Sequence, residues 1–75
     1  MDKSELLAVM AVGELLGYSV DAKPNVFGPK FWTAYVWKQG INAPTVVNTR
    51  RTTKTQAITY GWECVNEAIL GGHNV

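Results

Sequence analysis

The sequence predicts an α+β fold in which an N-terminal helix precedes an antiparallel β-hairpin and a second, amphipathic helix packs on the sheet. Residues 3–16 and 54–70 follow helix start signals and carry apolar side chains at helical spacing. Residues 30–39 are instead rich in aromatic and β-branched side chains, which favour strands. Because a chain of 75 residues buries a single small core, we expect one domain over residues 1–75.

The first predicted helix spans residues 3–16. Asp2 precedes Glu5 by three residues, which is the spacing of a capping box, and Gly17 stands where a helix would stop. Apolar side chains occupy both sides of its helical wheel. A helix that is apolar all round is normally buried on several sides, and the remaining elements of this short chain are too few to cover it completely.

The hairpin consists of two predicted strands, residues 30–39 and 45–51, joined by a turn region that contains glycine, asparagine and proline. Residues 18–22 are compatible with a short third strand, and the sequence leaves open whether this segment pairs into the sheet. A two-layer fold covers one sheet face with helices and leaves the other face to water. The exposed set is therefore one of two alternatives: Phe31, Tyr35 and Trp37, or Trp32 and Val36.

The second predicted helix spans residues 54–70. Thr53 and Gln56 form a capping box, and two glycines follow the last helical residue. One face of this helix is apolar and the opposite face is polar, as expected of a helix laid on a sheet. Its apolar stripe comprises Ala57, Ile58, Gly61, Val65, Ala68 and Ile69, with Trp62 and Cys64 at the margins. Residues 71–75 form the predicted tail, of which residues 73–75 are expected to be frayed.

A resemblance to known modules rests on the tryptophan-bearing strand and on the helix start Thr53–Ile58, read as T-x-x-Q-A-I. Over residues 30–70 the chain resembles the sheet-plus-helix half of small ββα and βββα modules of phage-encoded accessory proteins and uncharacterised bacterial families. In outline it also resembles a double-stranded RNA-binding domain. Of that family's basic helix-start signature only Lys54 is present, so neither resemblance supplies a functional residue.

The residues that enzymes use for catalysis are few in this chain and far apart. Cys64 lies near the buried side of its helix, and no spacing rule pairs it with His73 in the tail. Glu63 and Glu67 share a helix face that points away from the inferred core. One cysteine and one histidine do not make a structural metal site. We therefore expect a protein that is not an enzyme, without catalytic residues, metal, cofactor or small-molecule substrate.

The near-neutral net charge of +1 conceals a polarised chain. All six charged residues between positions 22 and 62 are lysine or arginine. The acidic residues stand on either side of this stretch, in residues 1–21 and 63–75. The total charge therefore excludes neither acidic proteins nor nucleic acids as partners.

The first predicted binding surface is a basic aromatic hairpin. Cations beside aromatic rings suit phosphate contacts and base stacking, and tryptophan, tyrosine and arginine are equally favoured in protein interfaces. The residues are Lys30, Trp32, Tyr35, Trp37, Lys38, Arg50, Arg51 and Lys54.

The second predicted surface is one face of the helix over residues 3–16. Its small and apolar side chains would let another helix approach closely, so we expect a protein partner or a second copy of the chain to dock there. The residues are Leu7, Ala8, Ala11, Val12 and Leu15.

These two surfaces lead to two functional hypotheses. The first is a protein-binding accessory module, an adaptor or inhibitor encoded by a phage or mobile element, because it accounts for both surfaces. The alternative is a nucleic-acid-binding module that uses the basic aromatic hairpin. The alternative explains only the hairpin, and the carboxylates of Glu63 and Glu67 would repel phosphate nearby.

The first 16 residues do not have the pattern of an export signal. Asp2 and Glu5 stand beside Lys3, so the positively charged start of a signal peptide is missing. The apolar run Leu6–Val12 is far shorter than the roughly 20 residues of a membrane span. A lone cysteine also fits a reducing compartment. We expect a soluble, cytoplasmic protein that does not contact membranes.

Overall fold

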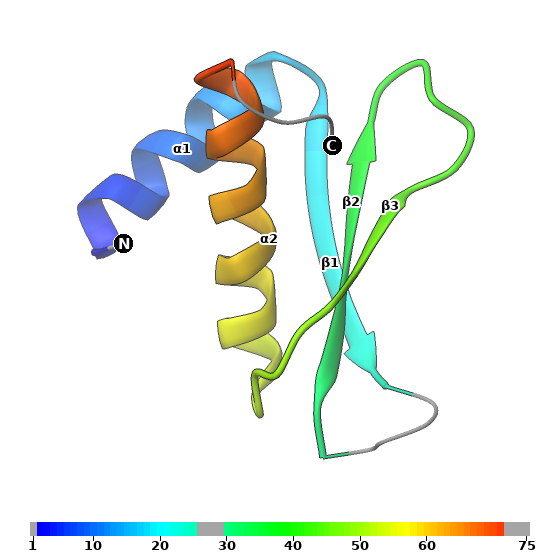
Figure 1. The fold of residues 1–75 in the computed structure, drawn as a ribbon. Coiled ribbons are helices and arrows are strands. Elements are labelled where there is room, and N and C mark those ends of the chain that lie inside the picture. Colours follow the sequence, from blue (N-terminus) through cyan, green and yellow to red (C-terminus); the bar gives the residue numbers. More distant parts are fainter. Residues whose placement is uncertain (1, 26–29, 72–75) are drawn as a thin grey trace.

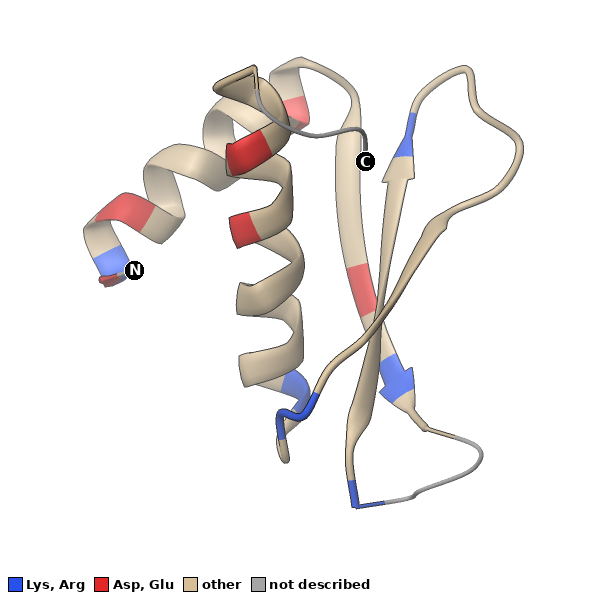
Figure 2. Cartoon of the chain, viewed as in Figure 1, with Lys and Arg blue, Asp and Glu red and all other residues tan. Residues whose placement is uncertain are grey.

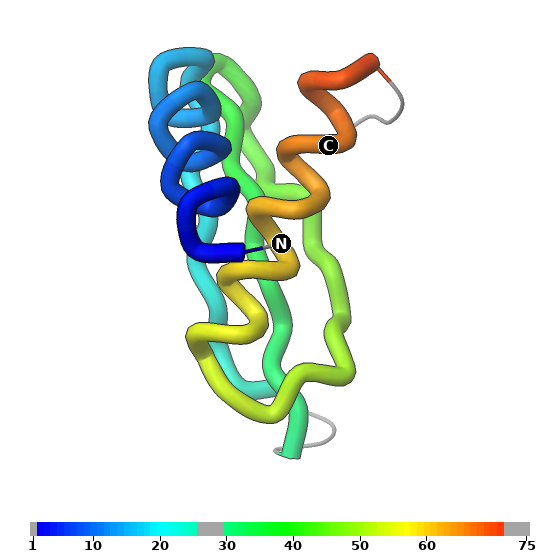
Figure 3. The backbone as a smooth tube through the Cα atoms, turned by 90° about the vertical axis from the view of Figure 1, so that its left-hand side faces the viewer, coloured from blue at the N-terminus to red at the C-terminus, as the bar shows by residue number. Residues whose placement is uncertain are grey.

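Two helices pack on the same face of a three-stranded antiparallel sheet (Figure 1). The computed structural model describes residues 2–25 and 30–71. The chain order is α1 (Lys3–Leu15), β1 (Tyr18–Pro24), β2 (Trp32–Lys38), β3 (Thr45–Asn48) and α2 (Lys54–Ile69). Seen from the side in Figure 3, both helices lie in front of the strands, so the molecule has two layers. The predicted α+β class is confirmed.

The segment at residues 18–22, left open by the sequence, belongs to the edge strand β1, which pairs with the central strand β2 along its full length. Its register places Val20 opposite Val36 and Ala22 opposite Ala34. These four side chains point toward the helices, and all except the half-buried Val20 are buried.

The two helices cover one face of β2 and leave the other face exposed. Ala34 and Val36 are covered by the helices, with the half-buried Trp32 on the same side. Tyr35 and Trp37 lie on the other face, because successive side chains of a strand alternate between faces. Of the two alternatives, the structure favours Phe31, Tyr35 and Trp37, although only Trp37 is exposed and the other two are half-buried.

Helix α1 has a local start signal but buries only one of its sides. The Glu5 N–H donates a 2.8 Å hydrogen bond to Asp2 Oδ1, which confirms the predicted cap. Gly13 is buried against the second helix, since a Cβ atom at this position would lie 2.7 Å from Cζ3 of Trp62. Leu6, Val9 and Met10 complete the packed side. The opposite side of α1 faces solvent.

Helix α2 crosses β1 and β2 and contributes most of the core. Thr53 caps it as predicted, its Oγ1 accepting a 3.2 Å hydrogen bond from the Gln56 N–H. Gly61 allows close contact with the sheet, because a Cβ atom there would lie 2.5 Å from Cγ1 of Val20. Trp62 was expected at the margin of the stripe, yet only 3% of it is exposed. Helix α1 covers that margin.

The largest boundary difference is at β3, which ends at Asn48 rather than at residue 51. In a regular ladder the Trp32 N–H would bond to the carbonyl of Thr49, its cross-strand partner. It bonds instead to the Arg51 carbonyl at 3.1 Å, so the chain bulges out of the ladder before α2 begins.

The remaining boundaries differ less. Strand β2 is shorter than predicted by two residues at its start and one at its end, and both helices end one residue early. The edge strand continues two residues further than the segment considered in the sequence. Except for Gly71, the predicted tail lies outside the described residues.

Candidate functional site

Five of the seven lysines and arginines gather at one end of the molecule, where β1 and β3 end and where β2 and α2 begin (Figure 2). All five are exposed. We call this group the basic end; its residues are Lys23, Lys30, Arg50, Arg51 and Lys54.

The bulge after β3 fixes the backbone of the two arginines. Thr49 is buried, and its hydroxyl donates a 2.7 Å hydrogen bond to the Trp32 carbonyl. The same hydroxyl oxygen accepts a 3.1 Å bond from the Arg51 N–H. Together with the bond from the Trp32 N–H to the Arg51 carbonyl, these contacts tie the Arg50–Arg51 segment to the central strand. The side chains of Arg50 and Arg51 therefore extend from a backbone segment that these hydrogen bonds hold in place.

The guanidinium of Arg51 lies 5.3 Å from the ring centroid of Tyr60 on α2, within the range of a cation–π contact. Two open depressions border this pair. One has a volume of about 430 Å³ and is lined by Arg51, Thr55, Gln56, Thr59 and Glu63. The other has a volume of about 330 Å³ and is lined by Asn48, Thr49, Arg50, Arg51 and Tyr60.

The start of α2 adds partial positive charge to the basic end. The first backbone N–H groups of a helix have no intrahelical partner and favour anions. Thr53 satisfies one of them, that of Gln56. Lys54 stands at the first helical position, so its ammonium charge and the helix terminus act in the same direction.

Among the described residues, two carboxylates approach the basic end. Asp21 Oδ1 lies 4.0 Å from the Lys54 Nζ, with more than half of each side chain exposed. Glu63 lines the larger depression on the side away from the start of α2. Glu67, the second acidic residue that was expected to repel phosphate, stands a further turn along α2. The basic end therefore keeps an excess of positive charge.

The eight residues of the predicted basic aromatic hairpin do not share one surface. Four belong to the basic end: Lys30, Arg50, Arg51 and Lys54. Tyr35 and Trp37 lie on the open face of the sheet. Trp32 is half-buried on the helix-covered face. Lys38 is at the opposite end of β2, with its Nζ 5.3 Å from the ring centroid of Tyr18.

Sequence reasoning left Lys23, Thr49 and Tyr60 out of the candidate site. Lys23 was counted among the charges, and only the pairing of β1 with β2 brings it to the basic end, where it stands opposite Thr33. The hydrogen bonds of Thr49 have no sequence signature. Tyr60 is one turn or more beyond the helix start, and its contact with Arg51 depends on where α2 crosses the sheet.

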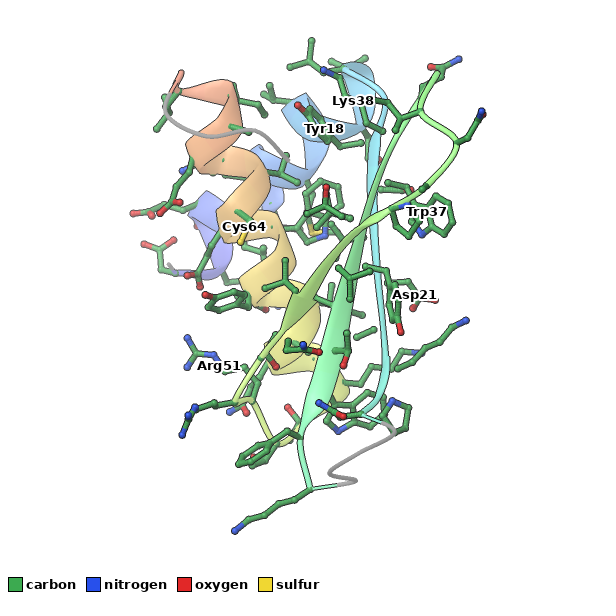
Figure 4. The ribbon with its side chains drawn as sticks, turned by 45° about the vertical axis from the view of Figure 1, so that its right-hand side comes forward. Tyr18, Asp21, Trp37, Lys38, Arg51 and Cys64 are labelled. Atoms are coloured by element: carbon green, nitrogen blue, oxygen red, sulfur yellow. The ribbon has the colours of Figure 1, made fainter. Side chains whose placement is uncertain are left out.

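The open face of the sheet carries exposed apolar side chains. Trp37 is 42% exposed and Val46 on β3 is 54% exposed. Tyr35 lies directly opposite Val46 and is half-buried. Figure 4 shows Trp37 and Asp21 on the side of the sheet that faces away from the helices.

The five residues predicted on the first helix are brought together. Leu7, Ala8, Ala11, Val12 and Leu15 are all exposed on the side of α1 that faces away from the core, and we call them the outer face of α1. Ala8 and Val12 also border a 240 Å³ apolar groove between the two helices, which Val9, Asn66 and Ile69 complete.

Cys64 is half-buried on α2. Burial raises the pKa of its thiol, and the negative charges of Glu67 and Glu63 raise it further. A thiol of this kind is a poor nucleophile near neutral pH. Within residues 2–25 and 30–71, no group of three or more histidine, cysteine, aspartate or glutamate side chains is arranged to hold a metal ion. His73 lies outside these ranges.

Neither helix of the described structure is long and apolar enough to cross a membrane. Comparisons of the chain with protein-family models, curated proteins and solved structures find no match.

Proposed function

We propose that this protein binds nucleic acid and holds the phosphate backbone with its basic end. The observation that carries the proposal is the convergence of five exposed cations on one end of the fold. They come from β1, from the start of α2 and from the segments that precede β2 and follow β3. Phosphate contacts by lysine and arginine supply most of the affinity of sequence-independent nucleic-acid binding. The Thr55 hydroxyl and the Gln56 amide line the adjoining depression and are further hydrogen-bond donors for phosphate. The Thr59 hydroxyl is engaged with the Thr55 carbonyl.

The geometry supports backbone contacts more than base stacking. Of the aromatic rings close to the arginines, Tyr60 is already engaged by Arg51 and Trp32 is half-buried. The exposed Trp37 stands near the other end of β2. We therefore expect affinities that depend on salt and little on base sequence.

Two features raise the nucleic-acid hypothesis above the protein-binding hypothesis that the sequence favours. Lys23 adds a fifth cation to the group, and Glu67 stands more than three helical turns from the start of α2. The exposed apolar side chains that favour a protein partner are not residues of the basic end, although the Lys23 ammonium lies 5.7 Å from the ring centroid of Tyr35 on the open face. One function does not have to account for both.

The experiment measures fluorescence anisotropy of labelled duplex and single-stranded RNA and DNA at low salt. The double variant Arg50→Gln, Arg51→Gln is expected to bind at least about tenfold more weakly. The matched control is Lys38→Gln, which removes a cation from the other end of β2 and should change the affinity about twofold or less. No binding by the native chain, or equal losses in both variants, would overturn the proposal.

A second candidate function, binding of a protein partner by an accessory module, is favoured by the open face of the sheet. A solvent-exposed tryptophan beside an exposed valine is typical of a protein contact. If the open face binds a protein, Trp37→Ser abolishes capture of that protein, while the arginine variant above retains it. If the arginine variant loses capture of the protein and Trp37→Ser retains it, this candidate is contradicted.

A further inference from the structure

We infer that the outer face of α1 pairs in antiparallel orientation with the same face of a second copy, forming a two-fold symmetric homodimer. Leu7 is 57% exposed and Leu15 is 87% exposed, so large apolar side chains at both ends of this face meet water in the single chain. With Val12, which is 47% exposed, the apolar side-chain surface of the outer face is on the order of 300 Å².

The spacing of the outer face matches that of a helix pair. Ser4, Ala8, Ala11 and Leu15 follow one another at intervals of four, three and four residues, the spacing of heptad seam positions. Leu7 and Val12 flank this seam. Alanine at the two central positions lets the backbones of two helices approach closely, and the leucines at the ends fill the wider space there.

Charge selects a second copy and the antiparallel orientation. Lys3 and Glu14 are eleven residues apart, so they lie about 20° apart around the helix axis, on the same flank of the seam. Both are exposed. In an antiparallel pair centred between Ala8 and Ala11, Lys3 of each copy lies beside Glu14 of the other. A parallel pair would place the Lys3 and Glu14 flanks of the two copies on opposite sides of the seam, so these opposite charges would not meet.

The apolar area predicts a modest affinity. Two outer faces bury on the order of 600 Å² of apolar surface, less than a standard interface of about 1,600 Å² in total. We therefore expect a dissociation constant in the micromolar range. Since none of the five basic-end residues lies on α1, dimer formation leaves both basic ends open to a ligand.

Sedimentation equilibrium of the native chain tests the inference directly. The expected result is reversible association to twice the monomer mass of 8.3 kDa. Ala11→Glu places a charge at the centre of the pair and should raise the dissociation constant at least about 100-fold. Circular dichroism checks that this variant folds, which an exposed helix position permits. The matched control is Val46→Glu on the open sheet face, which should leave the dimer intact.

A charge exchange tests the orientation. Lys3→Glu alone and Glu14→Lys alone each create two repulsive pairs in an antiparallel homodimer and should weaken it about tenfold. A mixture of the two variants should form a heterodimer with native-like affinity, because every cross-pair is then opposite in charge.

Three outcomes overturn the inference. A chain that stays monomeric up to about 1 mM does not pair through this face. A dimer that survives Ala11→Glu but is lost in Val46→Glu uses the open sheet face. Single-charge variants that dimerise as well as their mixture contradict the antiparallel pairing. The inference and the proposed nucleic-acid binding use different residues, so each can fail alone.

Discussion

The contact between α2 and the sheet at Gly61 is a sharp test of the packing. Gly61 is buried, and a Cβ atom at its position would lie 2.5 Å from Cγ1 of Val20 on β1. The next nearest atoms, the Cβ atoms of Ala34 and Val20, are each 3.6 Å away, an ordinary contact distance. The perturbation Gly61→Ala therefore meets one specific obstacle, a methyl group of Val20.

Two opposing effects determine the magnitude. In a helix interior with free space, Gly→Ala stabilises by about 1 kcal/mol through helix propensity. Here the new methyl group lies about 1 Å inside the usual carbon–carbon separation of about 3.5 Å, and overpacking of a core costs about 1–3 kcal/mol. We expect Gly61→Ala to lower the free energy of unfolding by about 1 kcal/mol, which lowers the Tm by about 4–8 °C.

A double-mutant cycle isolates the contact. Val20→Ala removes the obstructing methyl group, so in that background Gly61→Ala should stabilise the fold by about 1 kcal/mol. The assay is urea denaturation of the four chains, followed by circular dichroism. The predicted coupling energy between the two sites is about 2 kcal/mol. If Gly61→Ala changes stability equally in both backgrounds, α2 does not cross β1 at this position and the packing described above is wrong.

Three further predictions address the helix cap, the thiol and the edge of the basic end. Thr53→Ala should lower the free energy of unfolding by about 1 kcal/mol in urea denaturation, and an unchanged midpoint would contradict the cap. The Cys64 thiol should react with iodoacetamide more slowly in the folded chain than in urea, because burial and then Glu67 and Glu63 raise its pKa. At a pH where the thiol of the unfolded chain ionises, the thiol of the folded chain keeps its proton, so the free energy of unfolding should fall as pH rises through the ordinary thiol range. Cys64→Ser should remove this pH dependence of the free energy of unfolding. Asp21→Asn should strengthen duplex binding about two- to fivefold in low-salt anisotropy, and weaker binding would show that this carboxylate supports the site.

Local signals in the sequence predict the elements of this fold well. The caps at Asp2 and Thr53 each depend on two residues three positions apart, and both form as predicted. The period of β2 correctly separates its two faces. The sequence does not decide which face the helices cover, because aromatic side chains occur on both. That choice depends on Gly61 and Ala34, whose small size lets α2 approach one face.

The candidate site was less predictable because it is assembled by pairing between distant segments. Arg50, Arg51 and Lys54 are close in the chain, and the sequence groups them. Lys23 joins them only through the register of β1 with β2. Lys38 is separated from them because a strand of seven residues places its ends far apart.

The salt dependence of nucleic-acid binding tests the central claim most directly. If all five cations of the basic end contact phosphates of a duplex, the logarithm of the association constant should fall with the logarithm of salt concentration with a slope of about −4.5. The affinity would then drop about 500-fold between 50 and 200 mM salt. The double variant Arg50→Gln, Arg51→Gln should reduce the slope to about −2.7. A slope near zero, or a slope that the two substitutions leave unchanged, would contradict phosphate binding by the basic end.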